Sequence, residues 1–260
     1  MSDLRSDVSH SARIWNYWLG GTDHYPVDKE VGDQILSFVP ALPRSAVADR
    51  RFLARAVRYL AGEAGIRQFL DVGSGLPTAD NTHEVAQRVA PESRIVYVDN
   101  DPLVLTHAHT LLTSTPEGAT AYVEADVRDP EAILREAART LDLDRPVAIS
   151  MLGVLNFVLD TDEAASIVRR LLDAVPSGSH LVVSHPTTEV DGEAMAAAVE
   201  YWNGQGSAPM TLRTRADLIR LLDPVELLEP GVVTCSRWRP DEADADIVDV
   251  THFAGVGRKP

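Results

Sequence analysis

Apolar and polar positions follow two different patterns along the chain, and the pattern changes near residue 66. From residue 67 onward, short apolar runs rich in β-branched residues alternate with stretches of helical periodicity. The apolar runs predict five strands, at residues 67–72, 94–99, 120–126, 147–152 and 180–185. Strands that alternate with helices form right-handed βαβ units. These five strands are therefore expected to lie parallel in one sheet.

The stretches between the strands begin with side chains that can cap a helix. Such side chains accept a hydrogen bond from the first helical turn, and they predict helix starts at Asn81, Asp101, Asp129, Asp160 or Thr161, and Thr214. Residues 192–202 predict a further helix. The runs at 231–238 and 247–259 predict two more strands, which pair most simply as an antiparallel hairpin. The expected fold is α/β, with a seven-stranded mixed sheet of five parallel strands and a C-terminal antiparallel hairpin.

The first 66 residues contain no convincing strand pattern. They are expected to be helical on both sides of a break at Gly20–Gly21, and residues 45–65 have apolar side chains near one helix face. We expect residues 1–66 to form an N-terminal helical lid or cap. Residues 67–260 then form the sheet domain, and both parts belong to one structural unit.

A glycine turn follows the first predicted strand, in the sequence FLDVGSGLPTADNTHEVAQ at residues 69–87. In an open α/β sheet, ligands bind outside the carboxyl ends of the strands, close to such a turn. A P-loop needs a lysine, and the turn has none. A dinucleotide site is disfavoured because Asp71 ends the strand, and a carboxylate about 4 Å from a phosphate costs roughly 4 kcal/mol.

S-adenosylmethionine (SAM) fits the same turn because it carries a sulfonium and an ammonium group and no phosphate. Asp71 would attract these positive charges. Asp99, at the tip of the second predicted strand, suits hydrogen bonding to the ribose hydroxyls. Asp126, at the tip of the third, could accept from the adenine amino group. Capping of the next helix is the competing role for Asp99 and Asn100, and the preferred one for Asp101.

Charge and cysteine content exclude several other classes of function. The chain has 24 basic and 39 acidic residues, so its net charge of −15 disfavours nucleic acid as a partner. The pairs Arg50–Arg51 and Arg169–Arg170 lie on predicted helices and are interpreted as solvated. Cys235 is the single cysteine, which fits a reducing cytoplasm. The polar start and the shortness of the apolar runs argue against a signal peptide and a membrane span, so we expect a cytoplasmic protein.

The chain resembles the class I SAM-dependent methyltransferases. More narrowly, it is similar to an actinobacterial family first known as a domain of unknown function and now called S-adenosyl methyltransferase. The resemblance spans almost the whole chain and rests most on residues 12–30 (ARIWNYWLGGTDHYPVDKE) and 68–87, with support from 96–108, 230–241 and 253–260. It implies a Rossmann-like seven-stranded sheet with SAM over the strand tips. Generic methyltransferases prefer a third glycine in the turn, where this chain has Leu76, Pro77 and Thr78.

The resemblance also implies which residues contact SAM. The turn residues Asp71, Gly73, Ser74 and Gly75 correspond to the part of the site that holds the methionyl group. Asp99 and Asn100 correspond to the ribose and adenine edge, and Asp126 with Val127 to adenine. Residues 18–23 correspond to a lid over the cofactor, so its glycines Gly20 and Gly21 and the preceding Tyr17 are further candidates for cofactor contacts.

The candidates for acceptor chemistry are less specific. His185, at the tip of the fifth predicted strand, and His24, in the lid stretch, are candidate general bases, although His185 could instead serve a turn before Pro186. The aromatic residues near the lid and near residue 201 could line an acceptor pocket or pack in the core: Trp15, Tyr17, Trp18, Tyr201 and Trp202. No metal site is predicted, because His107 and His109 face different sides of a helix.

These observations predict a cytoplasmic methyltransferase that uses SAM as its cofactor and a small molecule as its methyl acceptor, with in-line transfer from the sulfonium. Two alternatives stay open. The chain could bind SAM as a sensor without transferring its methyl group, or use SAM in a reaction other than methylation. The sequence does not separate these three functions.

Overall fold

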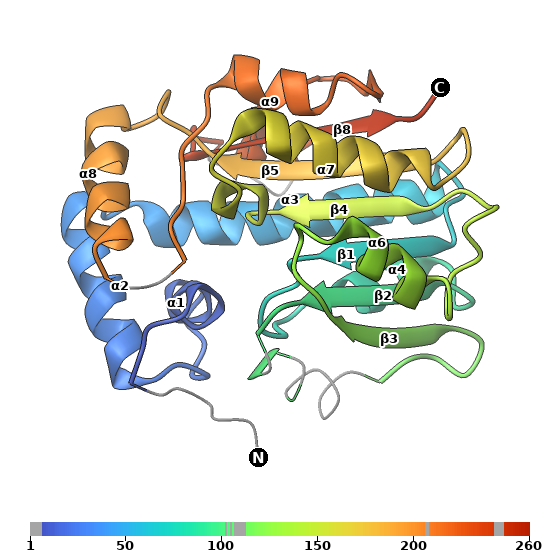
Figure 1. Ribbon diagram of the computed structural model, residues 1–260, viewed down its shortest axis with the longest axis horizontal. Coiled ribbons are helices and arrows are strands. Elements are labelled where there is room, and N and C mark those ends of the chain that lie inside the picture. Colours follow the sequence, from blue (N-terminus) through green and yellow to red (C-terminus); the bar gives the residue numbers. More distant parts are fainter. Residues whose placement is uncertain (1–6, 102, 105, 107–112, 206–207, 242–246) are drawn as a thin grey trace.

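A mixed β-sheet runs through the middle of the molecule (Figure 1). The computed structural model describes residues 7–101, 103–104, 106, 113–205, 208–241 and 247–260. The five predicted parallel strands are confirmed in the spatial order β3-β2-β1-β4-β5. They are β1 (Gln68–Val72), β2 (Arg94–Asp99), β3 (Ala119–Glu124), β4 (Ala148–Leu152) and β5 (His180–Pro186). Their carboxyl ends therefore meet at one edge of the sheet.

The antiparallel part of the sheet differs in detail from the predicted hairpin. Strand β8 (His252–Arg258) pairs antiparallel with β5 along its whole length. Two short strands, β6 (Glu226–Leu227) and β7 (Val233–Thr234), also pair with β8, which brings the sheet to eight strands. The mixed α/β fold is thus confirmed. The predicted hairpin is much shorter than expected, because within residues 231–238 only the two residues of β7 pair with β8.

Tertiary contacts shorten β7. After Thr234 the chain enters a 3₁₀ helix, η2 (Cys235–Arg237), and the side chains of Cys235 and Trp238 are fully buried. The buried guanidinium of Arg55 donates to the backbone carbonyls of Cys235 (2.7 Å) and Trp238 (2.9 Å). Because these carbonyls are satisfied by a helix side chain, they need no partner strand.

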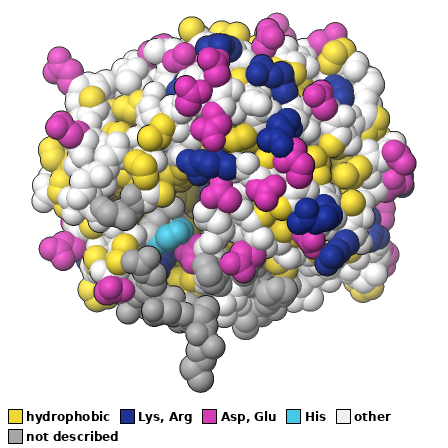
Figure 2. Space-filling model, in the orientation of Figure 1, with side chains coloured by type: hydrophobic (Ala, Val, Ile, Leu, Met, Phe, Trp, Pro, Cys, Tyr) yellow, Lys and Arg dark blue, Asp and Glu magenta, His cyan; other side chains and the backbone are white. Residues whose placement is uncertain are grey.

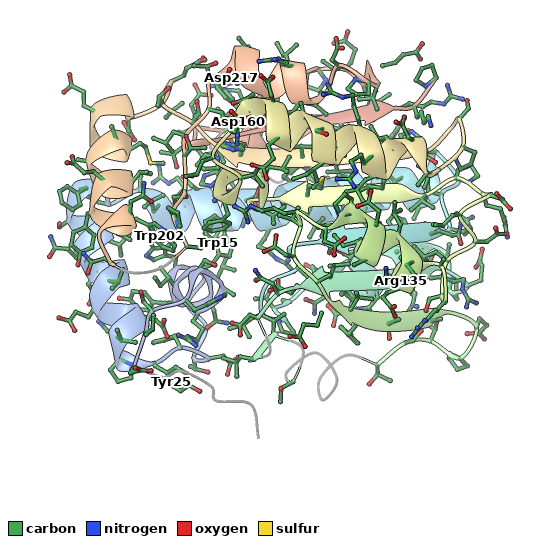
Figure 3. The ribbon with its side chains drawn as sticks, viewed as in Figure 1. Trp15, Tyr25, Arg135, Asp160, Trp202 and Asp217 are labelled. Atoms are coloured by element: carbon green, nitrogen blue, oxygen red, sulfur yellow. The ribbon has the colours of Figure 1, made fainter. Side chains whose placement is uncertain are left out.

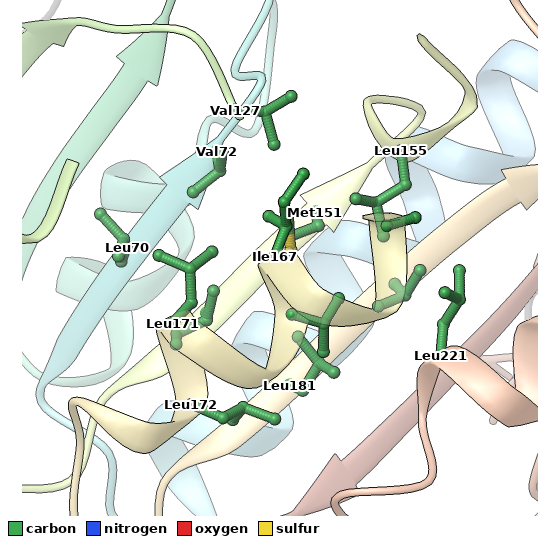
Figure 4. Packing of buried hydrophobic residues seen from close by; sticks show 14 of the residues in the cluster. Leu70, Val72, Val127, Met151, Leu155, Ile167, Leu171, Leu172, Leu181 and Leu221 are labelled. Carbon is green, nitrogen blue, oxygen red and sulfur yellow. The ribbon is translucent and has the colours of Figure 1, made fainter. Parts of the chain in front are cut away.

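Helices cover both faces of the sheet. On one face lie α3 (Leu42–Gly62) and α4 (Thr82–Val89), packed on Phe69 and its neighbours. On the other lie α6 (Pro130–Ala137), α7 (Thr161–Asp173) and α9 (Arg215–Leu221), packed on Leu70 and Val72 (Figure 4). Side chains alternate along a strand, so each strand contributes to two separate cores.

The N-terminal helices lie at the carboxyl ends of the strands. Helices α1 (Ser11–Trp18), α2 (Pro26–Phe38) and α8 (Gly192–Asn203) stand together there (Figure 1). They share an apolar cluster that includes Ile14, Ile35 and Trp202. A buried ion pair fixes α1 to α2, since Arg13 Nε lies 2.8 Å from an oxygen of Asp28. The three helices form a wall opposite the strand tips.

The predicted helix starts are confirmed for four helices. Asn81 with Glu84 and Thr214 with Asp217 form capping boxes at α4 and α9. The carboxylates of Asp129 and Asp160 accept from the first turns of α6 and α7. The helix predicted after Asp101 falls partly outside the described residues, as do His107 and His109.

Charged side chains of both signs are mixed on the face that carries α6, α7 and α9 (Figure 2). Arg170 of α7 pairs with Glu131 of α6, and Arg220 of α9 pairs with Asp162 of α7. Such exposed pairs each contribute about 0–1 kcal/mol. They link neighbouring helices without marking a site. Among the residues described, no helix is both long and apolar enough to span a membrane.

Candidate functional site

A cavity of about 310 Å³ opens at the carboxyl edge of the sheet. Its floor is formed by the turn after β1, the tip of β2 and the loops after β3 and β4. Its walls come from α1, α3 and α8. The volume is at the lower end of the range for small-molecule sites, about 300–1,000 Å³. One continuous space therefore joins the predicted cofactor residues to the N-terminal helices.

The glycine turn has a backbone that requires glycine. Gly73 and Gly75 have φ angles of +77° and +64°, which other residues rarely adopt. A Cβ atom on Gly73 would lie 2.6 Å from the Cβ of Val154, in the loop after β4. The Gly73 N–H donates to the carbonyl of Val98 at 2.8 Å. The turn, which contains Ser74, is thus held against both neighbouring strands and lines the cavity.

Asp71 lies beneath this turn and its carboxylate already has two partners. Thr82 Oγ1 donates to one oxygen (2.6 Å) and Ser150 Oγ to the other (2.9 Å). Burial raises the pKa of Asp71, while these two hydrogen bonds lower it. The residue lines the cavity as the sequence predicts. Its geometry also gives it a second task, which is to tie β1 to β4 and to the start of α4.

Asp99 fixes the turn from the tip of β2. Its two carboxylate oxygens accept from the backbone N–H groups of Gly75 (2.8 Å) and Asp101 (3.0 Å). Burial raises the pKa of Asp99, and the two amide hydrogen bonds oppose that rise. A carboxylate has about four acceptor sites, so each oxygen can accept one more hydrogen bond. Asp99 and the exposed Asn100 both line the cavity.

Asp126 and Val127 line the same cavity from the loop after β3. Asp126 is half-exposed and accepts from the backbone N–H of Arg128 at 2.8 Å. Val127 is buried and belongs to the same apolar core as Leu70 and Val72 (Figure 4). The structure thus brings together all the predicted residues of the three strand tips.

Arg50 is a cavity residue that the sequence pattern predicts to be solvated. It lies on α3 and lines the cavity beside Asp71, Ser74 and Gly75. Its Nη2 donates to the carbonyls of Ala79 (3.2 Å) and Asp80 (3.3 Å). Its Nε is buried, and no described residue accepts a hydrogen bond from it. A buried donor without a partner is costly, which favours a ligand that can accept from it.

The sequence of α3 contains one indication that Arg50 lies near the cavity, namely a charged residue on the buried side of the helix. Asp49 lies three residues before Phe52, on the buried side of the helix, and only 4% of it is exposed. A charged residue on the core-facing side of a helix is unusual, and it indicates that the helix meets polar groups at that position. Arg50 flanks that side of the helix. The apolar face that the sequence suggests includes Val47, which is instead 39% exposed.

The half of the cavity next to α1 and α8 is apolar. Trp15 and Trp202, labelled in Figure 3, line it from these two helices. Further apolar lining comes from Trp18, Ile35, Phe157, Met195 and Met210. Of the aromatic residues considered from the sequence, Tyr17 and Tyr201 do not line the cavity. Tyr201 packs against Phe38 instead, with ring centroids 6.0 Å apart.

The predicted lid contacts are not in the cavity lining. Tyr17 turns toward α2, where its hydroxyl donates to Asp33 and its ring lies 5.0 Å from the ring of His24. A Cβ on Gly21 would collide with the amide of Asn16, so this glycine is needed for packing of the turn. Gly20 has a φ angle of +80° and ends α1. In this structure Tyr17, Gly20, Gly21 and His24 shape the wall behind the cavity.

His185 does not line the cavity. Its neighbour Ser184 faces α3, and alternation along β5 turns His185 toward Arg213. Its Nδ1 donates to the carbonyl of Pro186 (2.8 Å), and its Nε2 accepts from Arg213 (2.7 Å). Burial lowers the pKa of His185 to about 3. With both nitrogens occupied away from the cavity, this position does not favour a role as general base.

His252 is one of two histidines that line the cavity, the other being His10 at the start of α1, and the sequence analysis singles out neither. His252 begins β8 and lies beside β5 at the carboxyl edge. Its ring contacts Trp15 edge-on, with centroids 5.4 Å apart. Within the described part of the chain, no group of three or more histidine, cysteine or acidic residues could hold a metal ion.

Comparison with known proteins agrees with this geometry. The family model for S-adenosyl methyltransferases matches residues 1–260. A DUF574 family protein from Streptomyces avermitilis is 50% identical, with a TM-score of 0.95 over 99% of this chain and 100% of that chain. A candidate methyltransferase from Thermobifida fusca is 40% identical, with a TM-score of 0.90 over 99% and 97%.

A more distant match shows the fold alone. It is an O-methyltransferase family 2 protein from Planctomyces limnophilus, which is 15% identical with a TM-score of 0.53 over 90% of this chain and 63% of that chain. No curated protein matches the chain.

Proposed function

Because the chain belongs to the S-adenosyl methyltransferase family, it is a SAM-dependent methyltransferase, and we propose that its methyl acceptor is a small molecule bound in the apolar half of the cavity. The observation that carries this proposal is the division of one cavity into two chemically different halves. The strand tips supply acids, glycines and Arg50, while α1 and α8 supply tryptophan and methionine. A cofactor and an acceptor that share the cavity would therefore be neighbours.

The polar half fits the parts of SAM residue by residue. The free lone pairs of Asp99 suit the two ribose hydroxyls. The unpartnered Nε of Arg50 suits the methionine carboxylate, and nearby Asp71 suits the ammonium group. Asn100, Asp126 and Val127 are assigned to the adenine edge. Arg50 thus joins the residues predicted from the sequence. We assign it to the methionine carboxylate, for which the sequence predictions name no residue.

When bound, SAM supplies a methyl group on a positively charged sulfur for in-line displacement. The chain contributes orientation and exclusion of water. The glycine turn allows close backbone approach, and the buried carboxylates at the strand tips favour a cationic ligand. The apolar walls remove water from the acceptor, which would expose its nucleophilic atom to the methyl group.

The experiment is transfer of a labelled methyl group to small molecules. The protein is incubated with methyl-labelled SAM and a cell extract filtered to remove macromolecules. We expect label in a product of low molecular mass, together with equimolar S-adenosylhomocysteine (SAH). Label that stays in SAM, although SAM binds by calorimetry, would contradict the proposal and favour a sensor. Label that enters only the unfiltered macromolecular fraction would contradict the small-molecule acceptor.

A further inference from the structure

Two residues that line the apolar half of the cavity each carry a hydrogen-bond acceptor. The first is Asn156, which lies in η1 (Leu155–Phe157) just after β4 and is only 3% exposed. Its backbone carbonyl accepts from the N–H of Thr211 at 2.8 Å. Its side-chain Oδ1 is buried and has no described partner. An acceptor left unsatisfied in an apolar wall calls for a ligand that donates to it.

The second acceptor is Nε2 of His252. The hydroxyl of Thr251 donates to Ser45 Oγ (2.9 Å), which leaves its oxygen to accept from Nδ1 of His252 at 3.4 Å. We assign the ring proton to Nδ1 on the basis of this contact, and that assignment leaves Nε2 as an acceptor. Burial lowers the pKa of His252 to about 4, so the ring is neutral at pH 7.

Among the described lining residues, both arginines are already engaged by acceptors of the protein. Arg50 donates to two backbone carbonyls. Arg128 donates to Asp126 and, at the border of the apolar half, to the carbonyl of Phe157. An anionic acceptor in the apolar half would have to compete with these groups for a partner or keep a desolvated charge unpaired, which is unfavourable. The site instead favours a neutral molecule.

On the premise of the small-molecule transfer above, we propose that the acceptor is a neutral aromatic compound with hydroxyl or amine hydrogens, which it donates to Asn156 Oδ1 and His252 Nε2. The rings of Trp15 and Trp202 supply faces and edges on which an aromatic frame can pack. The two acceptors then select molecules that present donors. Transfer of the methyl group breaks the S–CH3 bond of SAM, forms an O–CH3 or N–CH3 bond and leaves SAH, while the displaced proton passes to His252 Nε2. The product then lacks a hydrogen that the site recognises, which favours its release.

The test uses three probes with the same naphthalene frame: 2-naphthol, 2-methoxynaphthalene and 2-naphthoate. Each is titrated by calorimetry into the protein saturated with SAH. We expect 2-naphthol to bind about tenfold more tightly than 2-methoxynaphthalene, because only the hydroxyl donates a hydrogen bond. We expect 2-naphthoate to bind more weakly than both. Equal binding of the three probes, binding of none, or preference for the carboxylate would overturn the inference.

Two variants locate the preference. Asn156→Leu removes the amide at similar volume, and His252→Phe keeps a ring against Trp15. The matched control is His180→Phe, at the other end of β5, where burial also lowers the histidine pKa to about 4. In at least one of the first two variants, we expect the ratio of the affinities for 2-naphthol and 2-methoxynaphthalene to fall close to one. The control should keep the wild-type ratio. A preference unchanged in both variants would overturn the assignment.

The premise and the inference fail in different ways. If the wild-type protein does not bind SAH, the proposed cofactor site is wrong. If SAH binds and the probes show no preference for a donor, the cofactor site stands and the acceptor class is wrong. Retention of SAH binding by each variant serves as the folding check. Should a variant not fold, the three wild-type titrations decide the acceptor class alone.

Discussion

Arg50 is the residue whose environment is most informative about the cofactor. Its Nε is buried without a described partner beside the turn residues Ser74 and Gly75. Arg50→Met should weaken binding of SAH by about tenfold or more, because it removes a charge-assisted hydrogen bond to the carboxylate. 5′-Methylthioadenosine lacks the amino-acid part and therefore has no carboxylate for Arg50 to bind. Its affinity should stay within about threefold of the wild-type value.

Calorimetry with both ligands measures this contrast. Arg51→Met is the matched control, since Arg51 is exposed and does not line the cavity. It should leave both affinities unchanged. A parallel loss for SAH and 5′-methylthioadenosine in Arg50→Met would show that Arg50 supports the turn and does not bind the carboxylate.

Substitution of Asp99 should weaken binding of both ligands alike. Its oxygens hold the amides of Gly75 and Asp101 and have lone pairs left for the ribose, which both ligands contain. Asp99→Asn should therefore weaken both SAH and 5′-methylthioadenosine, by about 1–3 kcal/mol. The control is Asp129→Asn, because asparagine still caps α6 and this residue does not line the cavity. Unchanged affinity for both ligands in a folded Asp99→Asn protein would place the ribose elsewhere.

At the residue level, the sequence predicts the lining of the strand tips and misses residues brought in by tertiary packing. Asp71, Asp99 and Asp126 are visible because each follows an apolar run at the same edge of the sheet. Arg50 and His252 come from a helix and from the last strand, and nothing local links them to the turn. His185 is a candidate from the sequence because it lies at a strand tip, but that position does not decide which face the side chain takes, and the ring contacts Arg213.

At the element level, the turn after β1 depends on its contact with the loop after β4. Gly73→Ala combines an unfavourable φ of +77° with a collision with Val154. Gly65→Ala has a similar φ of +70° and open space around it. The first variant should lower the free energy of unfolding by at least about 1 kcal/mol more than the second. Urea denaturation of the two variants measures the difference.

Adding Val154→Ala identifies the cause. If the collision is responsible, Gly73→Ala should cost less in the Val154→Ala background than in the wild type. Equal costs for the two glycine variants, or no relief from Val154→Ala, would mean that the turn is not packed as described.

Helix starts and parallel strands could be predicted because their signals are local. The caps at Asn81, Asp129, Asp160 and Thr214 each need only three or four consecutive residues. The C-terminal pairing could not be predicted in this way. Strand β8 pairs with β5, and more than 60 residues of the chain separate the two strands. Adjacency in sequence suggests the hairpin, and burial of Trp238 under α3 overrides it.

At the scale of the whole molecule, buried neutral histidines make stability depend on pH. Burial lowers the pKa of His252 from 6.5 to about 4 and that of His185 to about 3. The unfolded chain takes up protons near pH 6.5 and the folded chain does not. The stability that each ring contributes is therefore present above pH 6.5 and is lost as the pH falls toward 4, by about 2 kcal/mol between pH 7 and pH 5.

Urea denaturation at pH 7 and pH 5 tests this effect. The free energy of unfolding should fall more in the wild type than in His252→Phe, by about 1–2 kcal/mol. Burial raises the pKa of Asp49, Asp71 and Asp99, which acts in the opposite sense but equally in both proteins. An identical fall in the two proteins would show that His252 is not buried in its neutral form.

At the scale of the whole molecule, the proposed arrangement has the cofactor at the strand tips and the acceptor beside α1, α2 and α8. The most direct test is a crystal structure of the complex with SAH. The account predicts the ribose hydroxyls within hydrogen-bond distance of Asp99, the methionine carboxylate on Arg50, and the sulfur facing the half of the cavity lined by Trp15 and Trp202. A nucleoside bound away from Asp99, or a sulfur facing away from that apolar half, would contradict it.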